Sequence, residues 1–482
     1  MIAAGAAGAA VAAVAASRLA VSRGFARAWH KVGGFAAESA AESLPVAPGH
    51  QQPQPPEHKS EEHQPWPAES APPALACRFC GAGLPRPFLD LGMSPLANSY
   101  VRPADLGRME PFYPLQLYVC PECRLVQLDE FESPERIFTD YAYFSSYSES
   151  WLRHAREYAE AMIARVGLGP HSRVVEVASN DGYLLKNFRD RGIPVLGVEP
   201  ARNVATAARA AGIPTIDKFF GVATARELLA AGHAADLLLG NNVLAHVPDL
   251  NDFVGGLRIL LRPTGLLTME FPHLLRLIEQ RQFDTVYHEH FSYFSLLAVE
   301  RVFAGHGLTL WDVDELPTHG GSLRVYVRHA DAPGGAEVTE RVHALRAREV
   351  AAGLDRTESY DAFAGRVVET KMALLEFLIR ARREGKVVVG YGAPAKGNTL
   401  LNFCGIRTDL LPFTVDRSPH KHGTYLPGTH IPVFPPERIF EVRPDYVLVL
   451  PWNLQEEIVT QMAAVREWGG QFVVPIPVLT VV

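Results

Sequence analysis

Six short and largely apolar runs alternate with helical stretches between Arg173 and Arg328, and this alternation constrains the fold most strongly. The runs are bounded by Gly, Pro and Asn, which predicts strands that are buried on both faces. Such strands require helices on both sides, so the pattern predicts a parallel α/β sheet. The expected strands are Arg173–Ala178, Val195–Glu199, Ala235–Gly240, Leu266–Phe271, Leu308–Val313 and Leu323–Arg328. No helical stretch separates the last two of these strands. The sequence therefore predicts that they form an antiparallel pair at one edge of the sheet.

A second α/β unit is expected near the C-terminus. A long, charged and helical pattern over Val338–Arg383 can bridge to it. Apolar runs at Lys386–Gly390, Pro412–Asp416 and Asp445–Leu450 then start a new series of strands. A chain of 482 residues has room for roughly three domains, and 48% hydrophobic residues supply more than one core.

Four of the five cysteines form two Cys-x-x-Cys pairs. Each pair can present two thiolates to one tetrahedral ion, and Gly81 and Gly83 supply turn residues for the first knuckle. Four protein ligands leave no open position, so the spacing predicts one structural zinc ion. The alternative is two unrelated thiol pairs. The predicted zinc ligands are Cys77, Cys80, Cys120 and Cys123.

The first forty residues are rich in Ala and Gly, and their charges are basic until Glu38. An Arg-bearing leader of this kind resembles a mitochondrial or plastid transit peptide, although a cytoplasmic location is the primary expectation. The stretch from Ser43 to Pro73 has the Pro-, Gln- and Glu-rich composition of a disordered linker. The expected organisation is a leader and linker over 1–74, a zinc-binding module over 75–140, a first α/β domain over 141–333 and a C-terminal domain over 334–482.

The overall charge argues against two classes of partner. Acidic side chains outnumber basic ones, which gives a net charge of -7, and no dense Lys or Arg run is present. We therefore expect no nucleic-acid partner and no membrane surface. The apolar start of the chain is too short and too weakly apolar for a membrane anchor.

Polar residues follow three of the expected strands. The first strand runs into the polar turn Glu176–Gly182, the second ends in Glu199, and the third runs out through Asn241 and Asn242 toward His246. In a parallel sheet these carboxyl ends share one edge, where nucleotide-like ligands bind. Glu199 is placed to accept hydrogen bonds from a ribose, although a solvated strand end is the plain alternative.

These residues resemble a class I S-adenosylmethionine-dependent methyltransferase. The resemblance is closer to the zinc-containing nucleotide-deoxysugar C-methyltransferases, and it covers Cys77 to the C-terminus. It rests on the cysteine quartet and on "YAYFSSYSESW" from Tyr141, "EVASNDGYLL" from Glu176, "NNVLAHV" from Asn241, "YHEHFSYFS" from Tyr287, "THGGSLRVYV" from Thr318 and "GYGAPAKGNTLLN" from Gly390. Ala178 and Asn180 stand at positions where methyltransferases commonly have glycine. This departure is the form that the subfamily itself has.

The resemblance implies an α/β fold with an N-terminal zinc-binding module, a central class I methyltransferase Rossmann-like domain and a second Rossmann-like domain. It implies S-adenosylmethionine as cofactor, bound by Glu176, Ala178, Ser179, Asn180, Asp181, Gly182, Glu199, Asn241 and Asn242. The family methylates the carbon beside the keto group of a nucleotide-linked sugar. The sequence names neither the sugar nor the nucleotide, and a small non-sugar ketone stays open as acceptor.

Methylation of such a carbon requires a base that removes a proton and donors that stabilise the enolate. Tyr287-His288-Glu289-His290 offers both, but strict extension would turn alternate side chains to opposite faces, so we expect a bend. By resemblance, His290 is the base and is assisted by Glu289, Tyr287, His246 and Tyr143. Two alternatives stay open: His288, Glu289 and His290 could bind a catalytic metal, and Tyr141 or Tyr147 could replace Tyr143.

The run Gly390–Gly397 follows an expected strand and opens a helix, and Asp416 ends the next strand. Alone, this pattern predicts an NAD-dependent oxidoreductase that acts on a nucleotide sugar, with Asp416 on the adenosine ribose. By resemblance, the same region holds the nucleotide diphosphate of the sugar, with substrate contacts from Lys396, Asn398, His422, Tyr425 and Arg324. A non-catalytic zinc-module adaptor is a third hypothesis. The expected oligomeric state is a monomer or a weak homo-oligomer.

Overall fold

The computed structural model describes residues 75–138, 146, 149–333 and 337–482. The predicted leader and linker, and with them the transit-peptide hypothesis, lie outside the described residues. Tyr143, Tyr141 and Tyr147 lie outside them as well. No helix in the described part of the chain is both long enough and apolar enough to span a membrane.

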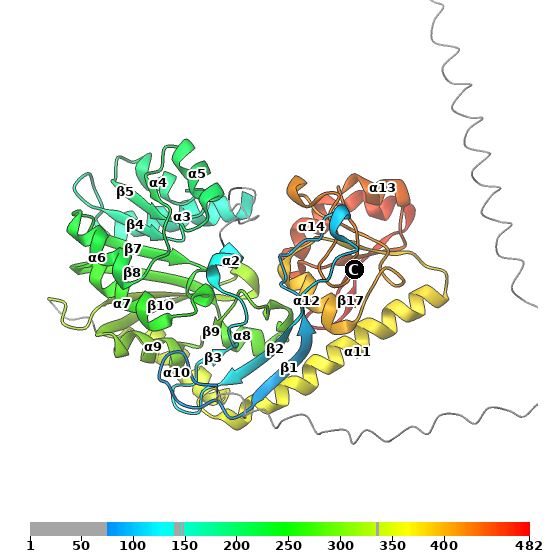
Figure 1. Cartoon of the computed structure of the whole chain (residues 1–482), viewed down its shortest axis with the longest axis horizontal. Coiled ribbons are helices and arrows are strands. Elements are labelled where there is room, and N and C mark those ends of the chain that lie inside the picture. Colours follow the sequence, from blue (N-terminus) through cyan, green and yellow to red (C-terminus); the bar gives the residue numbers. More distant parts are fainter. Residues whose placement is uncertain (1–74, 139–145, 147–148, 334–336) are drawn as a thin grey trace, which may run out of the picture. The chain divides into compact units, whose positions relative to one another are not determined.

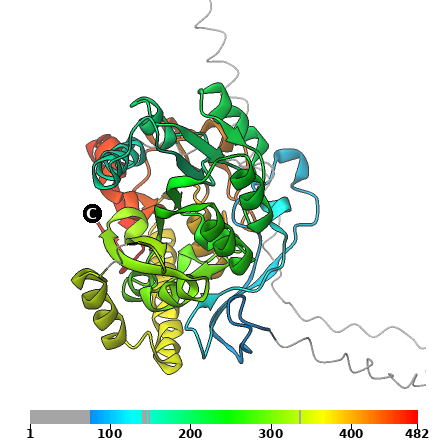
Figure 2. The same cartoon turned by 90° about the vertical axis from the view of Figure 1, so that its left-hand side faces the viewer.

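The N-terminal module is a small antiparallel sheet that takes its last strand from much later in the chain. Its order is β1-β2-β3-β9, and every neighbouring pair is antiparallel. Figure 2 shows its blue and cyan strands beside the green ribbon of the following domain. The elements are β1 (Pro87–Ser94), η2 (Pro103–Asp105), β2 (Tyr113–Val119), β3 (Val126–Gln127), α2 (Pro134–Phe138) and β9 (Ser292–Tyr293).

The middle domain contains a seven-stranded sheet in the order β10-β11-β8-β7-β4-β5-β6. Strands β4 to β8 are parallel, whereas β11 is antiparallel to both β8 and β10. All six expected strands are present, and the antiparallel edge pair is confirmed. The strands are β4 (Val174–Val177), β5 (Val195–Val198), β6 (Thr215–Ile216), β7 (Ala235–Asn241), β8 (Leu261–Pro272), β10 (Leu308–Leu316) and β11 (Ser322–His329).

Helices cover both faces of this sheet, as the continuous apolar strands predicted (Figure 1). Val174–Val177 and Val195–Val198 are buried at every position. The helices are α3 (Glu149–Val166), α4 (Leu185–Arg189), α5 (Arg202–Ala210), α6 (Val222–Ala230), η4 (Leu244–His246), α7 (Leu250–Leu260), α8 (Leu274–Glu279), η5 (Phe283–Thr285), α9 (Leu296–Gly305) and η6 (Thr318–Gly320).

The connection to the C-terminal domain is two helices and a short turn. The expected helical stretch divides into α10 (Glu340–Ala351), η7 (Thr357–Tyr360) and α11 (Asp361–Arg383). The break falls at Gly353, whose φ of 83° ends α10 in the left-handed region. Helix α11 packs against β1 of the N-terminal module, so it contacts a segment far from it in sequence.

The C-terminal domain contains a six-stranded sheet in the order β14-β13-β12-β15-β16-β17, which is parallel except for β17. The three expected strands correspond to β12 (Val388–Tyr391), β13 (Thr414–Val415) and β15 (Tyr446–Val449). The strands β14 (Val433–Phe434), β16 (Gln471–Val474) and β17 (Thr480–Val481) complete the sheet. Its helices are α12 (Ala395–Cys404), η8 (Pro419–Lys421), α13 (Glu437–Val442), η9 (Trp452–Leu454), α14 (Gln455–Gln461) and η10 (Ala463–Trp468).

Candidate active site

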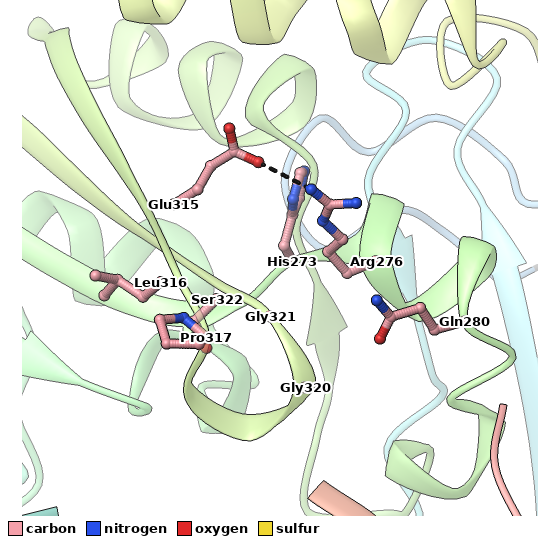
Figure 3. A pocket seen from close by; sticks show the side chains of 9 residues that line it. All are labelled: His273, Arg276, Gln280, Glu315, Leu316, Pro317, Gly320, Gly321 and Ser322. Atoms are coloured by element: carbon pink, nitrogen blue, oxygen red, sulfur yellow. Dashed lines mark hydrogen bonds and ion pairs between the residues drawn. The ribbon is translucent and has the colours of Figure 1, made fainter.

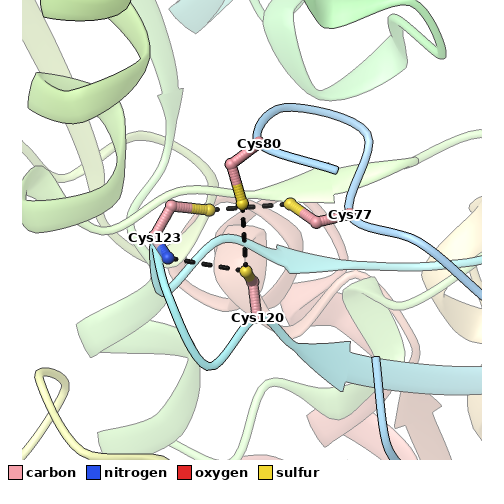
Figure 4. A group of neighbouring side chains, drawn as sticks. All are labelled: Cys77, Cys80, Cys120 and Cys123. Atoms are coloured by element: carbon pink, nitrogen blue, oxygen red, sulfur yellow. Dashed lines mark hydrogen bonds between the residues drawn. The ribbon is translucent and has the colours of Figure 1, made fainter. Parts of the chain in front are cut away.

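The four predicted zinc ligands converge at the N-terminal module (Figure 4). Their sulfur atoms all lie within 4.8 Å of one another. Each pair forms a knuckle, because Gly81 N donates to Cys77 O at 2.9 Å and Arg124 N donates to Cys120 O at 3.1 Å. A further donor, Gln127 Nε2, lies 3.2 Å from Cys77 Sγ. Four thiolates in this arrangement satisfy a closed tetrahedral ion, as expected for a structural site.

The turn after β4 has an unusual backbone that opens a cradle at the carboxyl edge of the sheet. Ala178, Asn180 and Gly182 have φ values of 56°, 49° and 80°. At Gly182 a Cβ atom would meet Ile213 Cγ1 at 2.7 Å, so the close approach requires glycine. The neighbouring Glu199 carboxylate accepts hydrogen bonds from Asn180 N and Ala201 N, both at 2.9 Å, and so fixes this turn.

Several buried polar atoms at this edge have no partner within the described part of the chain. They are Glu176 Oε2, Ser179 Oγ, Asp181 Oδ1, both amide atoms of Asn241 and Asn242 Oδ1. A buried polar group without a hydrogen bond costs free energy, and such a concentration marks a site that a polar ligand completes. Burial raises the pKa of Glu176 well above its usual value, and Glu199 adds to that shift.

A buried ion network lies at the end of β8, next to this edge. Arg324 Nη2 donates to Glu270 Oε2 at 2.7 Å, and His154 Nε2 lies 2.9 Å from the same oxygen. Burial disfavours the Glu270 carboxylate, but His154 and Arg324 hold its pKa below the usual value. The structure therefore joins Arg324, a predicted substrate contact, to Glu270 on the sheet.

His290 is fixed as a neutral imidazole. Its Nδ1 donates to Thr285 O at 3.0 Å, so Nε2 carries the lone pair and accepts from the Tyr287 hydroxyl at 2.8 Å. Burial lowers the pKa of His290 well below its usual value, and the neighbouring His246 lowers it further. The ring centroids of the two histidines are 4.7 Å apart. His246 Nδ1 donates to Glu289 O at 2.8 Å, and burial lowers the pKa of His246 to about 4.

The expected bend in Tyr287–His290 is present, because His290 N donates to Tyr287 O at 2.9 Å. The bend places Tyr287 and His290 together and turns His288 elsewhere. His288 Nε2 donates to Pro114 O at 3.1 Å, and its ring packs against Tyr113 and Phe131. His288 and His290 thus have separate surroundings, and the metal-ligand cluster found in the described residues is the cysteine quartet.

Glu289 joins the bend to the N-terminal module. Asn98 Nδ2 donates to both carboxylate oxygens of Glu289, at 2.9 and 2.7 Å. Burial raises the pKa of Glu289 to about 7. The carboxyl group can therefore be neutral near physiological pH, and a neutral carboxyl group can donate a hydrogen bond.

His319 is a third histidine at this site, and the residue patterns assigned it no role. Asn242 Nδ2 donates to its Nε2 at 3.1 Å, and the Trp151 ring packs edge-on at 5.3 Å. Burial lowers the pKa of His319 to about 4. Its φ of 56° places it in a strained turn before Gly320 and Gly321. A histidine beside two glycines, directly before an expected strand, was the available signal in the sequence.

The C-terminal domain reaches the same site through α12 and η9. Lys396 Nζ donates to Asn453 Oδ1 at 2.8 Å and lies 4.6 Å from the centre of the Trp452 ring. Asn398 Nδ2 donates to Ala97 O at 2.6 Å. Tyr425 forms a backbone bridge with Val101. Of the predicted substrate residues in this domain, the structure therefore places Lys396 on Trp452, which lies against the Gly320 turn after His319, and places Asn398 and Tyr425 against the N-terminal module.

His422 and Asp416 hold the turn after β13. His422 Nε2 donates to Asp416 O at 2.7 Å. The Asp416 carboxylate accepts from Ala393 N at 2.7 Å and from Ser418 N at 2.8 Å. Both oxygens of Asp416, the ribose ligand of the NAD hypothesis, thus accept backbone hydrogen bonds, as those of Glu199 do.

A separate cavity of about 430 Å³ lies beside the His319 turn (Figure 3). Its lining includes Gly320, Gly321, Arg276 and Glu315, and Arg276 Nη2 lies 3.5 Å from Glu315 Oε2. His273 also lines the cavity, but its Nε2 is bonded to the buried Glu349 at 2.7 Å. None of the predicted catalytic residues belongs to this lining.

The fold and the site together define an S-adenosylmethionine-dependent methyltransferase. Family models match three consecutive segments: a zinc binding domain over 77–138, a methyltransferase domain over 151–313 and a C-methyltransferase C-terminal domain over 317–477. The chain belongs to the zinc-containing C-methyltransferases, with S-adenosylmethionine as cofactor and zinc in the cysteine site.

Among named relatives, C-methyltransferase NovU of Streptomyces niveus is 37% identical over 405 residues, which covers 84% of this chain and 96% of that protein. The ubiquinone biosynthesis O-methyltransferase of Rhizobium etli (strain CIAT 652) is 32% identical over 99 residues, which covers 20% of this chain and 39% of that protein.

Two solved structures show a partial likeness. The PH0226 protein of Pyrococcus horikoshii OT3 has a TM-score of 0.32 and 17% identity, covering 41% of this chain and 99% of that one. Magnesium protoporphyrin IX methyltransferase of Synechocystis PCC 6803 with bound SAH has a TM-score of 0.31 and 15% identity, covering 40% and 92%.

Proposed function

We propose that this C-methyltransferase methylates the carbon beside the keto group of a nucleotide-linked deoxysugar through an enolate. The observation that carries the proposal is the fixed tautomer of His290. Its Nδ1 is held by Thr285 O, which leaves Nε2 as a proton acceptor beside the Tyr287 hydroxyl. Abstraction of a proton next to a ketone needs such a base and a nearby hydrogen-bond donor.

We assign the cofactor to the carboxyl edge of β4, β5 and β7. Glu199 can accept the ribose hydroxyls while its backbone contacts persist, because each carboxylate oxygen has a second lone pair. The partnerless atoms of Ser179, Asp181 and Asn241 suit the amino and carboxylate groups of the methionine end. S-adenosylmethionine supplies an electrophilic methyl group when bound there.

The second α/β domain supports a large and anionic substrate. Its helix α12 starts directly after β12, and a helix N-terminus after a parallel strand favours phosphate groups. The same helix reaches the first domain, because Thr399 Oγ1 donates to Val286 O at 2.9 Å. A substrate that occupied both regions would place its ketone near His290 and its diphosphate near α12.

The base assignment is tested with His290→Ala. Turnover should fall by roughly 100- to 10,000-fold, because general-base catalysis contributes about that much, while the dissociation constant for S-adenosylmethionine stays nearly unchanged. His288→Asn is the matched control from the same bend, and it should keep most of its turnover. Mass spectrometry of the methylated product and isothermal titration provide the two measurements. Full turnover in His290→Ala would move the base to another residue.

The substrate class is tested with keto-sugar nucleotides and with small ketones that lack the diphosphate. Transfer of a methyl group from S-adenosylmethionine should require the nucleotide-linked compounds. If only the small ketones were methylated, the sugar-nucleotide part of the proposal would be wrong and the enolate part would stand.

A further inference from the structure

Lys396 is a partly buried cation that the C-terminal domain contributes near the histidine cluster of the middle domain. It is the second residue of α12, and burial lowers the pKa of its ammonium group. Asp284 offsets part of that shift and so favours the charged form. The positive charge lowers the pKa of both His290 and His319, so the ammonium group lies within electrostatic range of both rings.

Contacts within the C-terminal domain fix this lysine in place, and one of its partners is bonded to the middle domain. Its ammonium lies over the Trp452 ring and donates to Asn453 Oδ1. Trp452 is held in turn, because its Nε1 donates to Asp284 Oδ2 at 2.7 Å. Asp284 belongs to η5, which leads directly into the bend that carries His290.

The His319 turn closes against the same tryptophan. At Gly320, whose φ is 91°, a Cβ atom would meet Trp452 Cη2 at 2.6 Å. Only glycine permits this approach, so Gly320, which follows His319, allows Trp452 of the C-terminal domain to pack against the site. Trp452, whose ring carries the Lys396 ammonium, is therefore positioned by contacts with the middle domain.

The charge of Lys396 complements the weak basicity of His290. A histidine with a strongly lowered pKa is unprotonated at every physiological pH, but it accepts a proton weakly. Proton transfer to it then depends on stabilisation of the other product, which is the enolate. A fixed ammonium group with little competing water stabilises such an oxyanion strongly.

We propose that Lys396 stabilises the enolate oxygen of the substrate, in place of a role at the diphosphate. This inference rests on the proposed function. The C–H bond beside the ketone breaks, its proton moves to His290 Nε2, and the electron pair forms the enolate, whose oxygen the Lys396 ammonium holds. The enolate carbon then forms a C–C bond to the methyl group as the C–S bond breaks and its electron pair stays on sulfur. The carbonyl re-forms, and His290 releases its proton to water.

The first test separates the two roles of the lysine. In Lys396→Met, turnover and solvent deuterium exchange at the acidic carbon should fall by roughly 100- to 1,000-fold, as for the loss of one oxyanion donor. The dissociation constant for thymidine diphosphate, which has no ketone, should change less than about threefold. Lys396→Arg keeps the charge and should retain more exchange. If thymidine diphosphate binding weakened as much as turnover, Lys396 would belong to the diphosphate and the inference would be wrong.

The matched control is Lys371→Met. Lys371 Nζ donates to Phe403 O at 2.7 Å and also lies 4.6 Å from an aromatic ring centre, but it is on α11. This variant loses a similarly placed ammonium group and should keep turnover. Thermal unfolding of both methionine variants identifies a general loss of stability.

The second test needs no substrate. NMR titration of labelled histidines should show that Lys396→Met raises the pKa of His290, because a neighbouring positive charge is removed. An unchanged pKa would show that the ammonium does not face the base. Absence of methyl transfer from wild type to every keto-sugar nucleotide would refute the proposed function, whereas the titration would still decide the position of Lys396.

Discussion

Glu199 shows how one carboxylate can serve both the backbone and a ligand. It fixes the turn through Asn180 N and Ala201 N, and we propose that it also binds the ribose of the cofactor. Glu199→Ala removes an acceptor whose hydrogen bonds are each worth about 1.5–3 kcal/mol.

Cofactor affinity should therefore fall roughly ten- to a hundredfold in Glu199→Ala, as isothermal titration can measure. Glu199→Gln keeps an acceptor oxygen and should lose less. An unchanged dissociation constant in the alanine variant would remove Glu199 from the cofactor site.

Glu289 makes stability depend on pH. Burial raises its pKa in the folded protein to about 7, whereas the unfolded value is near 4.5. The folded state thus holds an extra proton between these values, so the contribution of Glu289 to stability is fully present below pH 4.5 and is lost as pH rises through 7. The 2.5-unit difference corresponds to on the order of 3 kcal/mol.

Glu289→Gln removes this titration and keeps the shape of the side chain. Relative to wild type, the variant should gain stability as pH rises from 5 to 8 in urea unfolding at each pH. A difference that stayed constant across this range would show that Glu289 ionises normally in the folded state.

At the scale of elements, the zinc module shares a sheet with β9, the strand that follows the Tyr287–His290 bend. Strand β3 pairs with β9, and Leu128 N donates to Phe291 O at 3.0 Å, one residue after His290. Zinc orders the knuckle that precedes β3, so its loss should loosen the base as well as the module.

Cys120→Ser should lower zinc content, thermal stability and turnover, but S-adenosylmethionine affinity should change little because the proposed cofactor edge belongs to β4, β5 and β7. Elemental analysis, calorimetry and titration provide the measurements. Cys404→Ser, outside the quartet, should keep one zinc ion per chain. If Cys120→Ser lost zinc but kept full turnover, the loss of order in the zinc module would not extend through β3 and β9 to His290.

The sequence was informative about those elements whose signals are local. Continuous apolar runs such as Val174–Val177 predict buried parallel strands, and the strand ends then identify the edge with Glu199 and Asn241. By contrast, β6 and β9 contain two residues each, which is too short for a detectable pattern. The extension of β8 back to Leu261 crosses Pro263 and Gly265, which usually interrupt a strand.

The site was predictable where neighbours in sequence make the contacts and unpredictable where distant segments meet. The bend at Tyr287–His290 was expected because strict extension would turn its alternate side chains to opposite faces, and the structure has this bend but turns His288 elsewhere. The pairings of Asn98 with Glu289 and of Lys396 with Trp452 join separate segments of the chain, and no local pattern encodes them. The pKa shifts of Glu289 and His319 come from burial, which depends on the whole fold.

At the scale of the whole molecule, one hydrophobic core joins the N-terminal module to the C-terminal domain. It includes Phe88 of β1, Leu274 of α8, Phe363 of α11 and Leu448 of β15. Phe88 is 7% exposed, and its ring centre is 5.1 Å from that of Tyr360. These parts should therefore unfold together.

Phe88→Ala should cost roughly 3–5 kcal/mol, because it opens a cavity in this shared core. Calorimetry should show one lowered transition, and zinc release to a chromogenic chelator should move with it. Phe219→Ala, at a ring that is 40% exposed, is the control with little expected change. Two transitions of which only one shifts would contradict a shared core.

The pairing of β3 with β9 also affects how the chain is made. Ribosomes add roughly 5–20 residues per second, so the partner of Val126–Gln127 emerges about ten to thirty seconds after that strand. During this interval β3 has no partner strand on one side, so its backbone N–H and C=O groups can pair with other nascent chains. Its length of two residues limits that risk. Zinc orders the knuckle that precedes β3, so it would hold this edge in place while the chain is still being made. Zinc that is present during translation should therefore raise the yield of native enzyme more than the same zinc added after synthesis.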